Sequence, residues 1–219
     1  MEKLHWNTVS KGLKELLKSS MAEPLFSPFR LVGGTALSLY LGHRISVDID
    51  LFTDAPYDSI DFDAIKTYLE NRYPYVSEIG KGPVGMGKSY LVGPGGEDAV
   101  KVDLYYNDDF IRPYKTIDGI RLADMDDIAA MKIHVVQGIG RMKDFWDIHE
   151  LLDHYTVARM IELHKEKYPY HHDPETIVIN LTDFHKADTD FKPECLRGKH
   201  WELIRLDIAE AVETFKKSL

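Results

Sequence analysis

The pattern of hydrophobic and polar positions changes character a little past the middle of the chain. Up to residue 119, short apolar or alternating runs typical of strands are interspersed with segments of helical period. The elements predicted in this part are a helix at 3–19, a strand at 29–32, a helix at 35–41, a strand at 47–52, a helix at 60–72 and strands at 75–79, 89–92 and 100–106. The periodic segments after residue 119 are helical, at 123–137, 143–154, 157–167 and 201–217.

This order of elements predicts an α+β fold, with a mixed sheet and flanking helices plus a helical C-terminal part. The boundary is expected near residue 120, with a core and its N-terminal helix in 1–120 and the helical part in 121–219. A chain of 219 residues is long enough for a compact core with such an appendage. We expect the helical part to complete a cleft against the core.

The strand expected at 47–52 has one apolar face and one acidic face, because side chains alternate along a strand. The apolar face carries Ile45, Val47, Ile49 and Leu51, and the polar face carries Ser46, Asp48 and Asp50. Two carboxylates at i and i+2 lie about 7 Å apart at their Cα atoms, a spacing at which both can reach Mg²⁺. Asp103, between Val102 and Leu104 on another expected strand, is the candidate third ligand or base. The two strands together predict a divalent-metal site.

A Gly-Gly turn separates the strand expected at 29–32 from the helix after it. Gly33 and Gly34 have no side chain to obstruct a ligand, and the free N–H groups at a helix start attract phosphate. Asp-x-Asp occurs four times in the chain, but the pair Asp48 and Asp50 alone follows such a strand–turn–helix unit on an apolar strand. This context predicts that the turn binds the phosphates of a nucleoside triphosphate (NTP) and the pair binds its metal.

Three segments carry a resemblance to a known family. Residues 31–37 read Leu-Val-Gly-Gly-Thr-Ala-Leu, residues 42–52 read Gly-His-Arg-Ile-Ser-Val-Asp-Ile-Asp-Leu-Phe, and residues 141–147 read Arg-Met-Lys-Asp-Phe-Trp-Asp. With Lys132, they resemble the AbiEii/AbiGii-type nucleotidyltransferase toxins of the DNA-polymerase-β-like nucleotidyltransferase superfamily. The resemblance covers nearly the whole chain. Gly34 stands where the wider superfamily has serine, although Gly-Gly is common in this branch.

The resemblance implies a nucleotidyltransferase in which Asp48 and Asp50 bind Mg²⁺ (or Mn²⁺), Lys132 contacts the triphosphate and Asp144 is needed near the nucleotide. The expected catalytic set is Asp48, Asp50, Asp103, Lys132 and Asp144. The residues expected to contact the NTP are Gly33, Gly34, Thr35, Ser46, Lys132 and Arg141, with Thr35 as a substitute for the missing serine. The resemblance further implies the toxin of a toxin–antitoxin or phage-defence system, with tRNA or protein as acceptor and a cognate antitoxin as partner.

Simpler interpretations of the later motif residues stay open. Ile128, Met131 and Val135 define an inward helix face that would leave Lys132 on the surface. Asp144 and Asp147, one helical turn apart, could simply cap the helix that follows Gly140. A nucleotide- or partner-binding module without catalysis, and a nucleotidyltransferase that acts on a small molecule, are the alternative functions.

A P-loop ATPase is a further alternative, because residues 82–89 match the pattern Gly-x4-Gly-Lys-Ser. A P-loop must open a helix whose N-terminus holds the phosphates. Here Ser89 begins a short apolar run that ends at Gly93 and Pro94, so these glycines are expected to shape a hairpin turn instead.

The composition of the chain indicates which partners and which cellular compartment to expect. A formal net charge of −9 disfavours broad coating of nucleic acid but is compatible with one nucleotide bound through metal. Cys195 is the sole cysteine, so an intrachain disulfide is excluded and a reducing cytoplasm is favoured. No apolar run approaches the roughly 20 residues of a membrane helix. We therefore expect a cytoplasmic protein without a membrane partner.

Overall fold

The structure, a computed structural model, describes residues 3–80 and 85–218. Within these ranges seven strands form one mixed sheet of order β3-β4-β5-β2-β1-β7-β6. The strands are β1 (Arg30–Leu31), β2 (Asp48–Thr53), β3 (Tyr75–Ile79), β4 (Gly87–Gly93), β5 (Val100–Tyr106), β6 (Lys115–Ile117) and β7 (Ile120–Leu122). The helices are α1 (Lys11–Ala22), α2 (Gly33–Leu41), α3 (Phe62–Arg72), α4 (Met125–Ile139), α5 (Met142–Leu151), α6 (Val157–Lys167), α7 (Pro174–Asn180) and α8 (Trp201–Lys216). The fold is α+β, as the sequence predicts.

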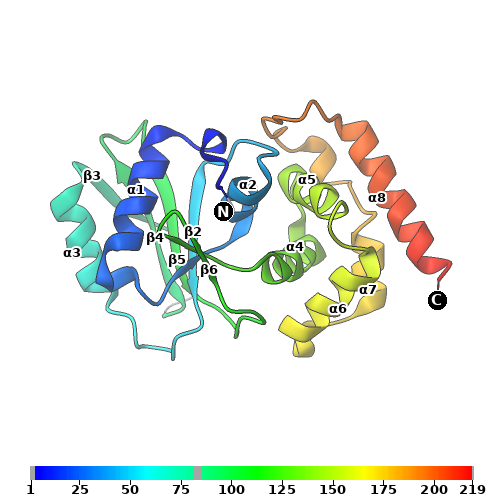
Figure 1. Ribbon diagram of the computed structural model, residues 1–219, viewed down its shortest axis with the longest axis horizontal. Coiled ribbons are helices and arrows are strands. Elements are labelled where there is room, and N and C mark those ends of the chain that lie inside the picture. Colours follow the sequence, from blue (N-terminus) through cyan, green and yellow to red (C-terminus); the bar gives the residue numbers. More distant parts are fainter. Residues whose placement is uncertain (1–2, 81–84, 219) are drawn as a thin grey trace.

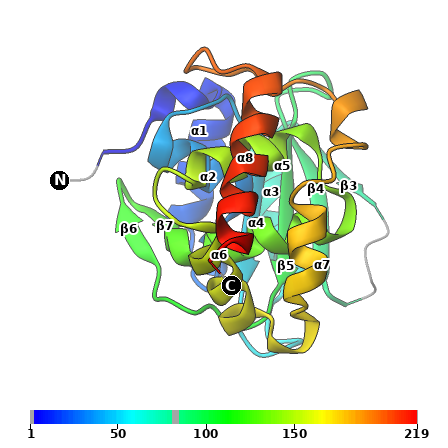
Figure 2. The same ribbon diagram turned by 90° about the vertical axis from the view of Figure 1, so that its right-hand side faces the viewer.

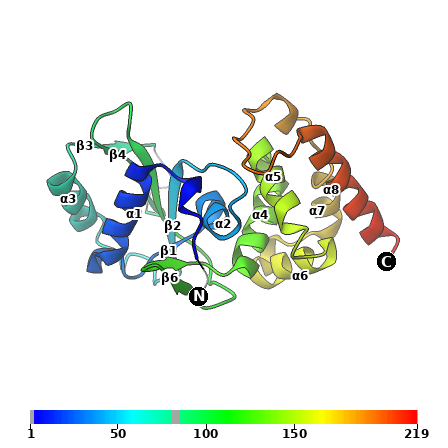
Figure 3. The ribbon, with the colours of Figure 1, turned by 45° about the horizontal axis from the view of Figure 1, so that its top comes forward.

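The sheet lies between two unequal layers of helix. Helices α1 and α3 cover one face, whereas α2 and α4 lie on the other and lead into the helical half of the molecule (Figures 1 and 3). Helix α4 packs against α2, α5 and α6, and α8 crosses the outside of α5 and α6 (Figure 2). Strand β7 is the last strand along the chain and α4 follows it, so the two halves meet where α4 packs against α2.

Strands β2 and β5 form the centre of the sheet and run parallel. Every second side chain of β2, from Ile49 to Thr53, is buried. Asp48, Asp50 and Phe52 lie on the opposite face and are half-buried. The register places Asp50 beside Asp103 of β5. The alternation predicted for both strands therefore brings their carboxylates to one sheet face.

Several predicted elements differ from the structure at their ends. The N-terminal helix begins at Lys11, because Ser10 caps it by accepting a hydrogen bond from the N–H of Leu13. Val47, expected on the apolar face, is 64% exposed because β2 begins only at Asp48. The hairpin β6–β7 and the two-turn helix α7 were not predicted, since segments of three to seven residues are too short to establish a period.

The segment with the P-loop pattern forms no helix start in its described part. Residues 81–84, including Gly82, lie outside the described residues. Gly87, Lys88 and Ser89 begin strand β4, and the Lys88 ammonium donates to Glu78 at 2.6 Å across the hairpin. This context excludes the phosphate-binding geometry of a P-loop. No helix in the described ranges is long and apolar enough to cross a membrane.

Candidate active site

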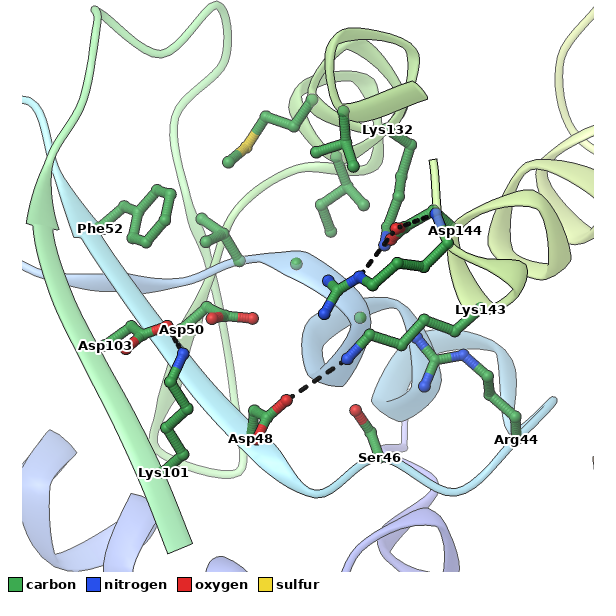
Figure 4. Close-up of a pocket in the computed structure, with 17 residues that line it drawn as sticks. Arg44, Ser46, Asp48, Asp50, Phe52, Lys101, Asp103, Lys132, Lys143 and Asp144 are labelled. Carbon is green, nitrogen blue, oxygen red and sulfur yellow. Dashed lines mark hydrogen bonds and ion pairs between the residues drawn. The ribbon is translucent and has the colours of Figure 1, made fainter. Parts of the chain in front are cut away.

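A pocket of about 200 Å³ lies between the face of β2 and β5, the start of α2 and the helices α4 and α5 (Figure 4). Its walls include every site residue predicted from the sequence except Thr35. Asp48, Asp50 and Asp103 form its floor, and Lys132 and Asp144 approach from the helical side (Figure 4). Arg141, the residue that precedes α5, also lines the pocket. Residues nearly 100 positions apart thus converge on one small cavity.

The three floor carboxylates share one environment but have different partners. The Lys143 ammonium donates to Asp48 at 3.4 Å, and the Lys101 ammonium pairs with Asp103 at 2.5 Å. Burial, followed by the charges of Asp103 and Asp48, raises the pKa of Asp50 to about 6. The cluster is therefore short of positive charge at neutral pH.

The donor set suits a hard divalent cation, although the side chains are not gathered into a finished cage. Among the described residues, no three His, Cys, Asp or Glu side chains are arranged to hold a metal ion. Asp103 Oδ1, however, is buried without a hydrogen-bond partner in the described part of the chain. A buried carboxylate oxygen left unpaired is costly. Carboxylate oxygens are the ligands that Mg²⁺ prefers, so the residues fit this ion.

Helix α2 begins at the pocket without a capping side chain. The sequence predicts a helix from residue 35, but the helix starts two residues earlier, after Val32, so the predicted start is wrong. The first N–H groups of a helix have no partner within it, and here they belong to Gly33 and Gly34 on the pocket wall. The helix ends at Leu41, where the sequence predicts, and is followed by Gly42 in the left-handed conformation.

Two hydroxyl groups beside the glycines have different roles. Thr35 is buried, and its Oγ1 contacts Ser46 Oγ at 2.8 Å and donates to the backbone oxygen of Asp48. This contact ties α2 to the start of β2 and does not bring Thr35 to the pocket. Ser46 does line the pocket. The structure thus places Ser46, and not Thr35, where a phosphate could reach it.

Behind the pocket lies a buried group of ion pairs centred on Asp147. The Arg44 guanidinium donates to both Asp147 oxygens at 2.7 Å, and His43 Nε2 lies 2.8 Å from Oδ1. The Lys132 ammonium lies 2.6 Å from Asp147 Oδ2 and 2.8 Å from Asp144 Oδ1. Burial alone would raise the pKa of Asp147, but Arg44 and Lys132 hold it well below its usual range. Asp144 and Asp147 thus hold Arg44 and Lys132 in place at the pocket wall.

This network overturns the simpler interpretation of Lys132. Only 6% of Lys132 is exposed, whereas Val135, expected to face inward, is 39% exposed. Helix α4 is turned so that its lysine points at α5, because the carboxylates of Asp144 and Asp147 compensate the buried charge. Asp144 does cap α5, since its Oδ2 accepts from the Arg141 N–H at 3.2 Å, but it binds Lys132 as well. Asp147, in contrast, is fully buried and binds Arg44, His43 and Lys132.

A family model described as "Nucleotidyl transferase AbiEii toxin, Type IV TA system" matches residues 15–217 of the chain. The chain belongs to this family. It is accordingly a nucleotidyltransferase, and the family description supports a toxin role. The match spans both the sheet and the helical half, so it includes every residue that lines the pocket.

Relatives of this AbiEii-family chain agree in length and fold. An uncharacterized protein of Aquifex aeolicus is 30% identical, with 96% of each chain covered. The crystal structure of JHP933 from Helicobacter pylori has a TM-score of 0.57 at 19% identity and covers 96% of this chain and 94% of its own. MenT4, a nucleotidyltransferase toxin of Mycobacterium tuberculosis, has a TM-score of 0.56 at 11% identity, over 92% and 83%. At such identities the two structures establish the shared fold.

In this AbiEii-family chain, sequence reasoning assigned no role in the site to several charged residues, among them Arg44, Lys101, Lys143 and Asp147. Lys101 had a local signal, because it lies two positions before Asp103 and therefore on the same strand face. Lys143 and Asp147 lie within the motif at 141–147, but only the packing of α5 directs one to Asp48 and the other to Arg44.

The Gly33→Ala variant is expected to lose both activity and stability. Gly33 has φ of 68°, a left-handed conformation that costs a residue with a Cβ roughly 1–2 kcal/mol. The added Cβ would also collide with the Asp50 carboxylate and displace it. Denaturant unfolding and nucleotidyl transfer would both be measured, with Gly95→Ala as the control, because a Cβ there meets open space. A Gly33→Ala protein equal to wild type in both would contradict this account of the turn.

Proposed function

We propose that this AbiEii-family enzyme transfers a nucleotidyl group from an Mg²⁺- or Mn²⁺-bound NTP to an acceptor hydroxyl. The acceptor oxygen forms a bond to the α-phosphorus, the bond from that phosphorus to its bridging oxygen breaks, and pyrophosphate leaves while the hydroxyl loses its proton. The observation that carries the proposal is the pairing of Asp50 with Asp103 beside a wall of fixed cations. Carboxylates and cations in one pocket suit a substrate that is both metal-bound and polyanionic.

The roles proposed for the floor residues follow from their chemistry. Asp48, Asp50 and Asp103 would hold the metal, and Asp103 is also the candidate base for the acceptor proton. When bound, the ion would neutralise charge on the reacting phosphate. Lys101 and Lys143, which now pair with Asp103 and Asp48, have half-buried side chains on the pocket wall and would turn toward phosphate oxygens.

The roles proposed for the walls concern the triphosphate. The N–H groups of Gly33 and Gly34 and the hydroxyl of Ser46 would donate to phosphate oxygens. Lys132 and Arg141 would add positive charge, with Asp144 positioning both, since it binds the lysine ammonium and the arginine backbone. The cleft would thus be completed by residues 121–219 closing on the core of 1–120.

The biological role proposed is that of a cytoplasmic toxin restrained by a cognate antitoxin. The family description, which names a type IV toxin–antitoxin system, supports this step. RNA, in particular tRNA, and protein are the proposed acceptors, because both carry hydroxyl groups that suit the reaction. A small-molecule acceptor would replace the toxin role with another one.

The test is label transfer from each of the four α-labelled NTPs, with Mg²⁺ and total cellular RNA and protein as acceptors. The Asp48→Asn variant is expected to transfer no label above background while it stays folded. Asp63→Asn, on an exposed helix turn, is the matched control and should equal wild type. Undiminished transfer by Asp48→Asn would refute the assignment. NTP binding without transfer to any acceptor would favour a binding module.

A further inference from the structure

The active-site pocket is too small to enclose a whole NTP. Its volume is about 200 Å³, whereas pockets that bury ligands of this size usually measure about 300–1,000 Å³. A second hollow of about 940 Å³ adjoins it and shares three lining residues, Phe52, Met131 and Val135. We call this second hollow the distal groove. The question is which part of the substrate would occupy it.

The passage between the two cavities is apolar. Phe52 follows Asp50 by two positions on β2, so it lies on the same sheet face as the floor carboxylates. Its ring packs edge-on against Tyr105, with centroids 6.1 Å apart, which holds it in place. Met131 and Val135, one turn apart on α4, form the opposite wall. The polar floor of the active-site pocket is therefore continuous with an apolar passage into the distal groove.

The distal groove is rich in rings and poor in available positive charge. Its aromatic side chains are Phe52, Tyr57, Tyr106, Phe110, His134, Tyr168, Tyr170 and His171. Of the described residues that line it, Lys167 is the one Lys or Arg, and its buried ammonium is bound by Asp127 at 3.4 Å and by the backbone oxygen of Asp109 at 3.1 Å. Asp108 and Asp109 add carboxylates to its rim.

The active-site pocket, in contrast, is lined by five cationic side chains among the described residues. The cations that line it are Arg44, Lys101, Lys132, Arg141 and Lys143. Phosphates therefore belong in the pocket, where these cations and a metal held by the floor carboxylates would offset their charge, whereas the distal groove has carboxylates and a single, already paired lysine among its described lining residues. The same charge balance disfavours the phosphate backbone of an RNA acceptor in the groove. A neutral, flat, aromatic group suits the groove, because rings and thioethers pack well against such faces.

We infer that the distal groove binds the nucleoside of the NTP, with the base packed between Phe52 of β2 and Met131 of α4. The triphosphate lies in the active-site pocket, and the nucleoside passes Val135 into the groove. This inference rests on the proposed function, because it assumes that the pocket holds the phosphates. Phe52 and Met131 are then positioning and affinity residues for the NTP.

The experiment compares a probe that lacks the nucleoside with probes that carry it. The full-length protein with Mg²⁺ would be titrated calorimetrically with inorganic tripolyphosphate and with α,β-methylene analogues of the four NTPs, which resist transfer. Phe52→Ala and Met131→Ala are expected to weaken the analogues about tenfold, the effect of losing one stacking or packing partner of a base. Both variants should bind tripolyphosphate as wild type does. Phe191→Ala, which removes a phenylalanine that is 93% exposed elsewhere, should change neither affinity.

Each other outcome overturns a distinct statement. If tripolyphosphate binds and both variants keep wild-type affinity for the analogues, the nucleoside does not occupy the groove. If the variants instead raise only the KM for acceptor, the groove belongs to the acceptor and the inference is wrong. If wild type binds neither tripolyphosphate nor any analogue, the proposed function itself fails. Should Phe52→Ala not fold, Met131→Ala decides, because it changes the opposite wall.

Discussion

The Asp50→Asn variant is expected to lose nucleotidyl transfer by at least about 10²–10³-fold and yet to be more stable than wild type without metal. The amide keeps the shape of the side chain but removes the charge that would bind the cation. Asp50 lies between Asp48 and Asp103, and repulsion from both, together with burial, opposes its ionisation. Removing that charge relieves the repulsion in the metal-free protein. Activity and stability should therefore change in opposite directions.

The pH dependence of this stability effect has a definite sign. The pKa of Asp50 is raised from 3.8 in the unfolded chain to about 6 in the fold. Folding thus favours the protonated form of Asp50. The stability that this carboxyl group contributes to the wild-type fold is fully present below pH 3.8 and is lost as pH rises through about 6. In EDTA, the Tm of Asp50→Asn should exceed that of wild type at pH 8 and approach it at pH 4.

The two readouts separate a metal ligand from an ordinary structural residue. Asp63→Asn, on the exposed first turn of α3, is the control and should leave both the activity and the pH profile unchanged. Mg²⁺ should raise the Tm of wild type at pH 8 but not that of Asp50→Asn. A variant that keeps its activity, or that is destabilised at pH 8 in EDTA, would contradict the assignment of Asp50.

The Asp147→Asn variant is expected to show the largest loss of stability, about 3–5 kcal/mol, the usual cost of breaking a buried ion pair. Asp147 is fully buried and is the carboxylate on which Arg44, His43 and Lys132 converge. A neutral amide would leave two buried cations with one remaining carboxylate, Asp144. The fold must then either take up water or expel a charged side chain, and both are unfavourable.

Denaturant unfolding of Asp147→Asn measures this loss, with Asp153→Asn as the matched control. Asp153 is an exposed aspartate just beyond the end of α5, and its replacement should stay within about 0.5 kcal/mol of wild type. A loss below about 1 kcal/mol for Asp147→Asn would show that the network does not carry the predicted energy. Activity should fall as well, because Lys132 and Arg44 border the active-site pocket.

The elements of the central site could be predicted because their signals are local. Alternation along residues 47–52 and 100–106 depends only on neighbouring side chains, and it correctly placed Asp48 and Asp50 on one face and Asp103 opposite its apolar neighbours. Strands β3 and β5 and helix α6 begin and end where the pattern predicts. The Gly-Gly turn was likewise visible from the residues themselves. These features required no knowledge of what packs against them.

Contacts between distant segments could not be predicted in the same way. Hairpin β6–β7 has three-residue strands, and β7 exists because it pairs with β1, about 90 positions earlier. The burial of Lys132 depends on α5 lying against α4, which supplies the carboxylates that make a buried ammonium tolerable. Hydrophobic periodicity alone therefore placed Lys132 on the wrong face.

Local patterns in the chain were sufficient to predict the α+β class, the two carboxylate-bearing strands, the glycine turn and the family. Each of these is encoded by residues close together in the chain, through side-chain alternation, helical period or a contiguous motif. The tertiary structure alone decided that Asp50 pairs with Asp103, that Asp147 anchors Arg44 and Lys132, and that Phe52 opens onto the distal groove. Such relations depend on strand order and helix packing, whose energies come from contacts between segments that local patterns do not link.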